Sequence, residues 1–97
     1  MSVLIIIKRV FRMDQTKQLV PLLKELRAKS EIQPGFISRT TYSNLSDPGE
    51  LVVIMEWKTA DDWIKWMNHE EAKDLQWQID SLIGEKTFFE VYKPEDF

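Results

Sequence analysis

One helical stretch gathers the residue types that can do chemistry in this chain of 97 residues. Trp63, Trp66 and Met67 recur at spacings of three and four, so they share one face of a helix. His69, the only histidine, follows directly, and an imidazole changes protonation near neutral pH, as a general base must. The aromatic face predicts either the lid of a core or the wall of a pocket. His69 is accordingly either a base or a helix cap.

Four further side chains are candidates for a ligand site. Lys8 follows the apolar run of the first strand, where a buried lysine is costly unless paired, so it would stabilise an anion or else extend to water. Arg39 suits an anionic substrate if it is buried, although its strand is too polar to assign it a face. Gln76 lies at the rim of an apolar helical stripe and either binds a ligand or faces solvent. Phe36, which opens the second strand, joins the substrate-binding candidates.

Composition excludes several classes of function. The net charge is −3, from 13 basic and 16 acidic residues, without the clustered basic face that nucleic-acid binding needs. Cysteine is absent and histidine occurs once, which leaves no disulfide, thiolate or multi-histidine metal site. The apolar run at residues 3–7 is too short to span a membrane. We expect a soluble, cytoplasmic protein with no nucleic-acid or membrane partner.

Hydrophobic periodicity predicts the order β-α-β-β-α-β. The expected strands cover residues 3–11, 36–43, 51–57 and 86–93. The first helix is expected from an N-cap at Asp14 to about Ser30, with a kink or a late start because Pro21 interrupts its pattern. The second helical region begins at a Thr59 N-cap, divides into two pieces and ends at Gly84.

This order favours an α+β fold, a ferredoxin-like sandwich with a four-stranded antiparallel sheet and the helices on one face. The continuous apolar run at residues 3–7 is typical of a strand covered on both faces. The other face of the sheet therefore needs an apolar cover, and pairing of two sheets in a homodimer is the simplest one. No linker or repeat divides the chain, so one domain over residues 1–97 is expected.

Three segments carry a family resemblance, namely Gln33-Pro-Gly-Phe36, Glu56-Trp-Lys-Thr59, and Trp63-Ile-Lys-Trp66 followed by Asn68-His-Glu-Glu71. Together they resemble the antibiotic biosynthesis monooxygenase (ABM) superfamily of dimeric α/β barrels over nearly the full length, although each segment alone is weak. The resemblance implies a homodimer with a pocket between sheet and helices in each subunit. The superfamily includes oxygenases that use neither metal nor flavin, haem-degrading enzymes and isomerases, so membership does not fix the reaction.

The haem-degrading branch would need an Asn on the first strand and a His ten residues after a helical Trp. Carried onto this sequence, Trp66 matches the Trp, whereas Lys8 takes the Asn position and Gln76 the His position. Because an amide does not replace imidazole as an axial iron ligand, haem degradation is disfavoured unless His69 serves in another register. No cofactor is expected.

The resemblance leads to the hypothesis of a monooxygenase without metal or flavin, acting on a small aromatic, quinol-like or polyketide-like substrate. Trp66 would wall the pocket, His69 would be the base and Lys8 would stabilise the developing anion. The substrate-binding candidates are Trp63, Gln76, Phe36 and Arg39. The alternatives are a non-catalytic dimeric barrel that binds a small apolar metabolite, and an isomerase that uses the same pocket.

Overall fold

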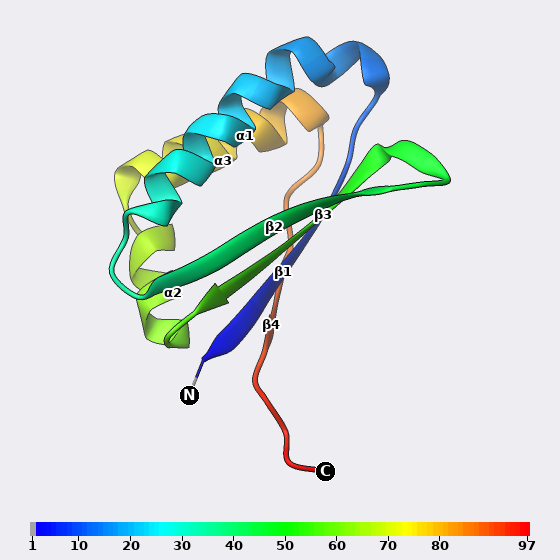
Figure 1. Ribbon diagram of the computed structural model, residues 1–97. Helices are drawn as coiled ribbons and strands as arrows, with labels where there is room; N and C mark the ends of the chain where they lie inside the picture. Colours follow the sequence, from blue (N-terminus) through cyan, green and yellow to red (C-terminus); the bar gives the residue numbers. More distant parts are fainter. Residues whose placement is uncertain (1) are drawn as a thin grey trace.

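The computed structural model describes residues 2–97, in which three α-helices cover one face of a four-stranded sheet (Figure 1). The strands are β1 (Val3–Val10), β2 (Phe36–Asn44), β3 (Asp47–Trp57) and β4 (Phe89–Tyr92). The helices are the 3-10 helix η1 (Met13–Gln15), α1 (Thr16–Glu31), α2 (Ala60–Met67) and α3 (Glu70–Ile83). The strand order is β2-β3-β1-β4 with antiparallel neighbours. The predicted ferredoxin-like α+β fold is confirmed.

Element boundaries differ from the prediction at three places. The first α-helix begins at Thr16, because η1 takes up Asp14 and the N–H of Arg12 donates to Gln15 Oε1 at 3.0 Å. The β2–β3 hairpin is longer than expected and closes around an Asn44 side chain that accepts the Ser46 N–H. The last strand is shorter and begins at residue 89. None of the helices within residues 2–97 is long and apolar enough to cross a membrane.

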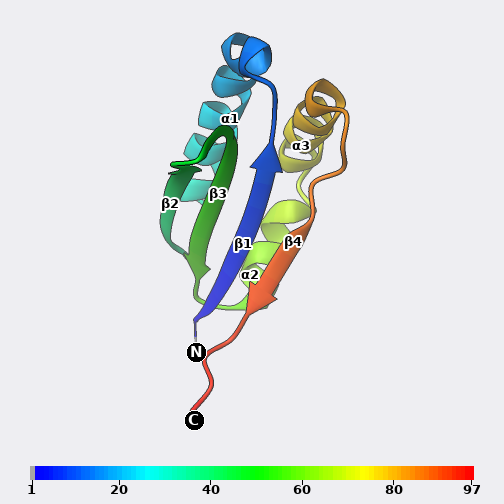
Figure 2. The same cartoon turned by 90° about the vertical axis from the view of Figure 1, so that its right-hand side faces the viewer.

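The central strand β1 has two different faces. Ile5, Ile7 and Arg9 are buried on the side covered by the helices. Their neighbours in sequence point to the other side, because successive side chains of a strand alternate. Figure 2 shows this second side with no helix in front of it. We call it the open sheet face, and its apolar members are Leu4, Ile6, Val10, Tyr42, Val52, Ile54 and Tyr92.

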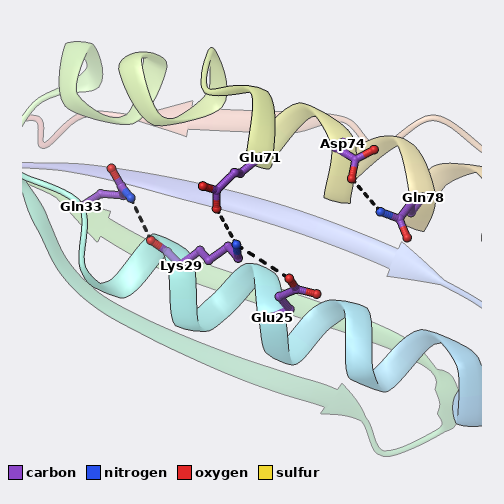
Figure 3. Close-up of polar contacts among 6 residues, drawn as sticks. All are labelled: Glu25, Lys29, Gln33, Glu71, Asp74 and Gln78. Atoms are coloured by element: carbon purple, nitrogen blue, oxygen red, sulfur yellow. Dashed lines mark hydrogen bonds and ion pairs between the residues drawn. The ribbon is translucent and has the colours of Figure 1, made fainter.

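The core lies between this sheet and the helices. Trp57 of β3 and Leu19 of α1 are fully buried, as are Ile5 and Ile79. α1 and α3 lie side by side over the sheet (Figure 2). Their exposed edges are linked by Lys29, whose ammonium group donates to the Glu71 carboxylate (Figure 3). Such exposed ion pairs contribute little stability, so burial of the apolar side chains holds the layers together.

Gly35 allows β2 to begin next to the first turn of α2. Its φ is +88° and its carbonyl accepts the Lys58 N–H at 2.7 Å. A Cβ at this position would overlap the carboxylate of Asp62. Thr59 is the N-cap of α2, as predicted, and its Oγ1 accepts the Asp62 N–H at 3.0 Å. This hydrogen bond fixes the position of Asp62. Only glycine meets both requirements, a left-handed backbone and a missing side chain.

We expect Gly35→Ala to lower the free energy of unfolding by about 2–4 kcal/mol, from left-handed strain plus the overlap with Asp62. Gly84→Ala is the matched control, because Gly84 has a φ of +86° but open space around its Cβ position. It should cost only about 1–2 kcal/mol. Urea denaturation measures both values, and equal losses would show that the overlap with Asp62 is relieved without cost.

Candidate functional site

A cavity of about 200 Å³ lies between α1 and the sheet. α1 supplies one wall and strands β1, β2 and β3 supply the other. Its apolar walls come from both layers, with Val20 and Leu23 on the helix and Leu51 and Val53 on the sheet. We call it the arginine cavity, and its remaining lining residues are Arg9, Lys24, Arg27, Arg39 and Thr41.

Strand register places both sheet arginines at this cavity. Arg9 follows Ile5 and Ile7 at intervals of two and therefore shares their buried face. Arg39 of β2 pairs with Met55 of β3, which is buried on the same side. The sequence left the face of Arg39 open, because β2 is polar on both sides, and its pairing with β3 decides it.

Arg9 is buried and forms no ion pair with an acidic side chain of residues 2–97. Its side chain is 97% buried, since only 3% of the residue surface is exposed. The Nη2 group donates to Gln76 Oε1 at 3.3 Å, while Nε and Nη1 have no hydrogen-bond partner among the described residues. Buried charged groups are normally paired. Arg9 Nε and Nη1 are therefore buried donors whose hydrogen bonds are unsatisfied.

Arg39 has a similar surplus of donors. Its Nη1 approaches only the sulfur of Met55, at 3.9 Å, and its buried Nε has no partner among residues 2–97. Guanidinium groups present a planar fork of donors that matches carboxylates and other oxyanions. Two such groups facing one partly apolar cavity describe a site for an anionic organic molecule.

Burial makes both positive charges unfavourable. It lowers the pKa of Arg9 to about 10, with repulsion from Arg39 adding to the effect and attraction to Asp80 opposing it. Burial likewise lowers the pKa of Arg39 to about 10, together with repulsion from Arg27 and against attraction to Glu31. Both groups remain protonated at neutral pH, so an anion that enters the cavity relieves this destabilisation.

A hydrogen-bond network holds Gln76 against Arg9. The Gln76 Nε2 group donates to Asp80 Oδ1 and to Thr87 Oγ1, both at 2.8 Å. The Thr87 N–H and hydroxyl also donate to Asp80 Oδ1. This network turns the Gln76 oxygen toward Arg9 and links α3 to the segment before β4. Gln76 was expected to touch a ligand or solvent, and the structure places it behind Arg9.

Trp66 and His69 come together elsewhere, at a cavity of about 160 Å³ beside the α1–β2 loop. Their ring centroids are 5.5 Å apart. Trp66 is buried and His69 exposed, and His69 occupies the N-cap position of α3 without a capping bond from its side chain. The lining of this histidine cavity shares no residue with the arginine cavity. Its lining residues are Gln33, Pro34, Asp62, Lys65, Trp66 and His69.

Lys8 does not join Trp66 and His69. Its side chain lies on the open sheet face, is 62% exposed and pairs with Glu50 at 3.2 Å. The sheet separates it from the arginine cavity, and it does not line the histidine cavity. Of the two alternatives for Lys8, the structure shows the side chain that extends to water, and the cation of β1 on the helix-covered face is Arg9. The unbroken apolar run before Lys8 did not reveal which residues of the strand face the helices. Arg9 follows Ile5 and Ile7 at intervals of two residues, and this spacing was the sequence signal that could have identified Arg9 as the buried cation.

The two remaining aromatic candidates pack within the protein. Trp63 of α2 contacts Phe89 of β4, with ring centroids 5.3 Å apart. Phe36 contacts Trp57 edge-on at 5.5 Å. Neither Trp63 nor Phe36 lines the two cavities described above. Residues 2–97 contain no group of three or more acidic or histidine side chains placed to hold a metal ion.

We expect Arg9→Met to raise the melting temperature, because it replaces an unpaired buried cation with an apolar side chain of similar length. We expect a gain in stability of about 1–2 kcal/mol. Each kcal/mol raises the melting temperature of a domain of this size by roughly 4–8 °C. Arg12→Met is the control, since the Arg12 side chain is 77% exposed and its loss should change stability by less than about 0.5 kcal/mol. A lower melting temperature for Arg9→Met would identify Arg9 as a structural residue.

The difference in stability between the wild type and Arg9→Met depends on pH. Between about pH 10 and the higher pKa of an unfolded arginine, the unfolded chain binds more protons than the folded one, so wild-type stability rises with pH. The advantage of Arg9→Met should therefore be complete at neutral pH and shrink above pH 10. Urea denaturation at pH 8 and pH 10.5 measures it, and an advantage that grows with pH would contradict the cause assigned here.

Comparisons with known proteins agree on one fold. A conserved protein from Methanosarcina mazei Go1 superposes with a TM-score of 0.88 at 17% identity, covering 97% of this chain and 93% of its own. A crystal structure of an antibiotic biosynthesis monooxygenase gives 0.85 at 18%, covering 97% and 99%. SnoaB, a cofactor-independent oxygenase from Streptomyces nogalater, gives 0.84 at 12%, covering 99% and 95%. At these identities the likeness shows the fold alone.

A search of curated proteins found no match. The family model for antibiotic biosynthesis monooxygenase, by contrast, matches residues 2–77, which include β1, the β2–β3 hairpin and all the lining residues of both cavities. The matched region contains Arg9, Arg39, Trp66 and His69. The chain therefore belongs to the antibiotic biosynthesis monooxygenase (ABM) family.

Proposed function

We propose that this protein is a monooxygenase that oxidises a small phenolic or quinol-like substrate in the arginine cavity, without metal or flavin. The observation that carries this proposal is Arg9, a buried guanidinium with free donors at an apolar cavity. Membership of the antibiotic biosynthesis monooxygenase family supports the reaction class without fixing it. Arg9 and Arg39 take the role expected of Lys8, namely stabilising the substrate anion.

The cavity favours the ionised form of a bound phenol. Its described lining contains neither a carboxylate nor an imidazole, so it lowers the phenol's pKa by binding the phenolate and leaves the proton to solvent. Each unit of lowering corresponds to about 1.4 kcal/mol of preference for the anion. Fixed donors in a site sheltered from water stabilise such charge more strongly than water does.

The phenolate then reacts with dioxygen. Electron transfer to dioxygen is followed by formation of a C–O bond on the ring, and cleavage of the O–O bond releases water. For a hydroquinone the balance is hydroquinone plus dioxygen giving hydroxyquinone plus water. The quinol loses four electrons and dioxygen gains four, one oxygen atom enters the product, and the two hydrogens lost by the quinol leave in the water.

Dioxygen uptake with hydroquinone substrates, in the presence of a metal chelator, tests this function. We expect Arg9→Gln to lower kcat/KM by about 100-fold, the usual effect of removing a donor to a developing oxyanion. Arg12→Gln, the exposed control, should match the wild type. Isotopic oxygen in the product would confirm that one atom is transferred.

The histidine cavity is the second candidate site, favoured by the contact between the Trp66 and His69 rings. His69→Ala distinguishes the two. Loss of uptake in His69→Ala but not in Arg9→Gln would move the reaction to the histidine cavity, with His69 as its base. Binding of a phenol without any dioxygen uptake would support the non-catalytic barrel instead.

We also infer that two copies pair through the open sheet face. The residues Ile6 and Ile54 lie opposite each other near its centre, and both are apolar on a face that no helix of residues 2–97 covers. Leu4 and Tyr92 extend the apolar area and are 41% and 47% exposed in the single chain. Such a contiguous exposed apolar patch marks an interaction surface.

Ile54→Lys should therefore convert a dimer into a monomer, because it places a charge at the centre of the paired sheets. Analytical ultracentrifugation measures the mass. Ile64→Lys is the matched control, since Ile64 lies on α2, is 46% exposed and is not part of the open sheet face. A wild-type protein that sediments as a monomer would exclude pairing through this face.

A further inference from the structure

We propose that Arg39 binds the carboxylate of a single-ring aromatic acid whose ring lies between α1 and the sheet. This inference rests on the proposed function for the phenolic group of the substrate, which would lie at Arg9. The substrate class is therefore a hydroxylated benzoic acid, with one oxygen at the buried Arg9 and the carboxylate at Arg39, which is less deeply buried.

The charges around the cavity call for more than one anionic group. Four of its nine lining residues are cationic and none is acidic. Arg27 is paired with Glu31 at 2.7 Å, whereas the ion pairs within residues 2–97 include none made by Arg9, Lys24 or Arg39. One phenolate leaves most of this charge uncompensated, and a carboxylate on the same molecule supplies the second negative charge.

Arg39 is the position that fits the carboxylate. Its Nε has no partner, and Arg27 is close enough to repel it. A carboxylate between these two groups would accept hydrogen bonds from a planar fork and reduce their repulsion. Arg9 is more deeply buried and already donates to Gln76, so it has fewer free directions for a second large group.

The size and walls of the cavity set the rest of the ligand. An apolar cavity of about 150 Å³ holds one benzene ring, and this cavity measures about 200 Å³. One ring with its substituents fits, whereas drug-sized ligands occupy roughly 300–1,000 Å³. The aliphatic walls face each other from helix and sheet, as a flat ring requires. A phosphate ion would leave these walls without contact.

Isothermal titration calorimetry with benzoate, benzamide and inorganic phosphate tests the inference without any turnover. Benzamide has nearly the shape of benzoate but no charge, so we expect benzoate to bind at least about 10-fold more tightly. Arg39→Gln should weaken benzoate binding by about 10- to 100-fold, and Arg12→Gln should not change it. Circular dichroism checks that each variant is folded.

Three results would overturn the inference: equal binding of benzoate and benzamide by the wild type, phosphate binding at least as tight as benzoate binding, or unchanged benzoate affinity in folded Arg39→Gln. The first two need no variant. Its failure is distinguishable from that of the proposed function. If benzoate binds but no dioxygen uptake is seen, the proposed oxygenase function fails and the carboxylate site stands. If neutral hydroquinones support dioxygen uptake and benzoate does not inhibit it, the oxygenase function stands and the carboxylate site fails.

Discussion

The alternation of side chains along β1 is the constraint on which the rest of this structure depends. This strand lies between β3 and β4, so both its edges are paired and its residues can only point to one face or the other. One phase brings Ile5, Ile7 and Arg9 beneath the helices, and the opposite phase brings Ile6 and Lys8 to the open sheet face. A shift of one residue would exchange the buried arginine for the exposed lysine.

Under the proposed function, the buried arginines lower the stability of the fold and bind the substrate anion. Selection for stability alone would favour apolar side chains at the positions of Arg9 and Arg39, because unpaired buried cations oppose folding. The network of Gln76, Asp80 and Thr87 satisfies one edge of Arg9 and leaves the other free. In the proposed function, this support would hold the Arg9 side chain in place for the substrate anion before it binds.

The two faces of the sheet have separate tasks under this interpretation. The helix-covered face encloses the arginine cavity, whereas the open sheet face offers apolar side chains to a second copy. Lys8 and Glu50 form an ion pair on the open face. This pairing explains how a lysine is accommodated beside Ile6 and Val52 without a ligand. The apolar run of β1, which is unusual for a half-exposed strand, is then explained by burial on both sides in the dimer.

Local signals in the sequence determined the order of the elements, the Thr59 cap, the division of the second helical region and the stop at Gly84, since each depends on residues within one or two turns. The pairing of Trp66 with His69 also followed from local spacing. The faces of Lys8, Arg9 and Arg39 were decided only by tertiary structure. The start of β1 is apolar at every position and β2 is polar at most positions, so neither strand shows the alternation that would identify its buried face. The pairing of both strands with β3 therefore decides which cations are buried. The arginine cavity combines residues from α1 and three strands, which no local pattern brings together.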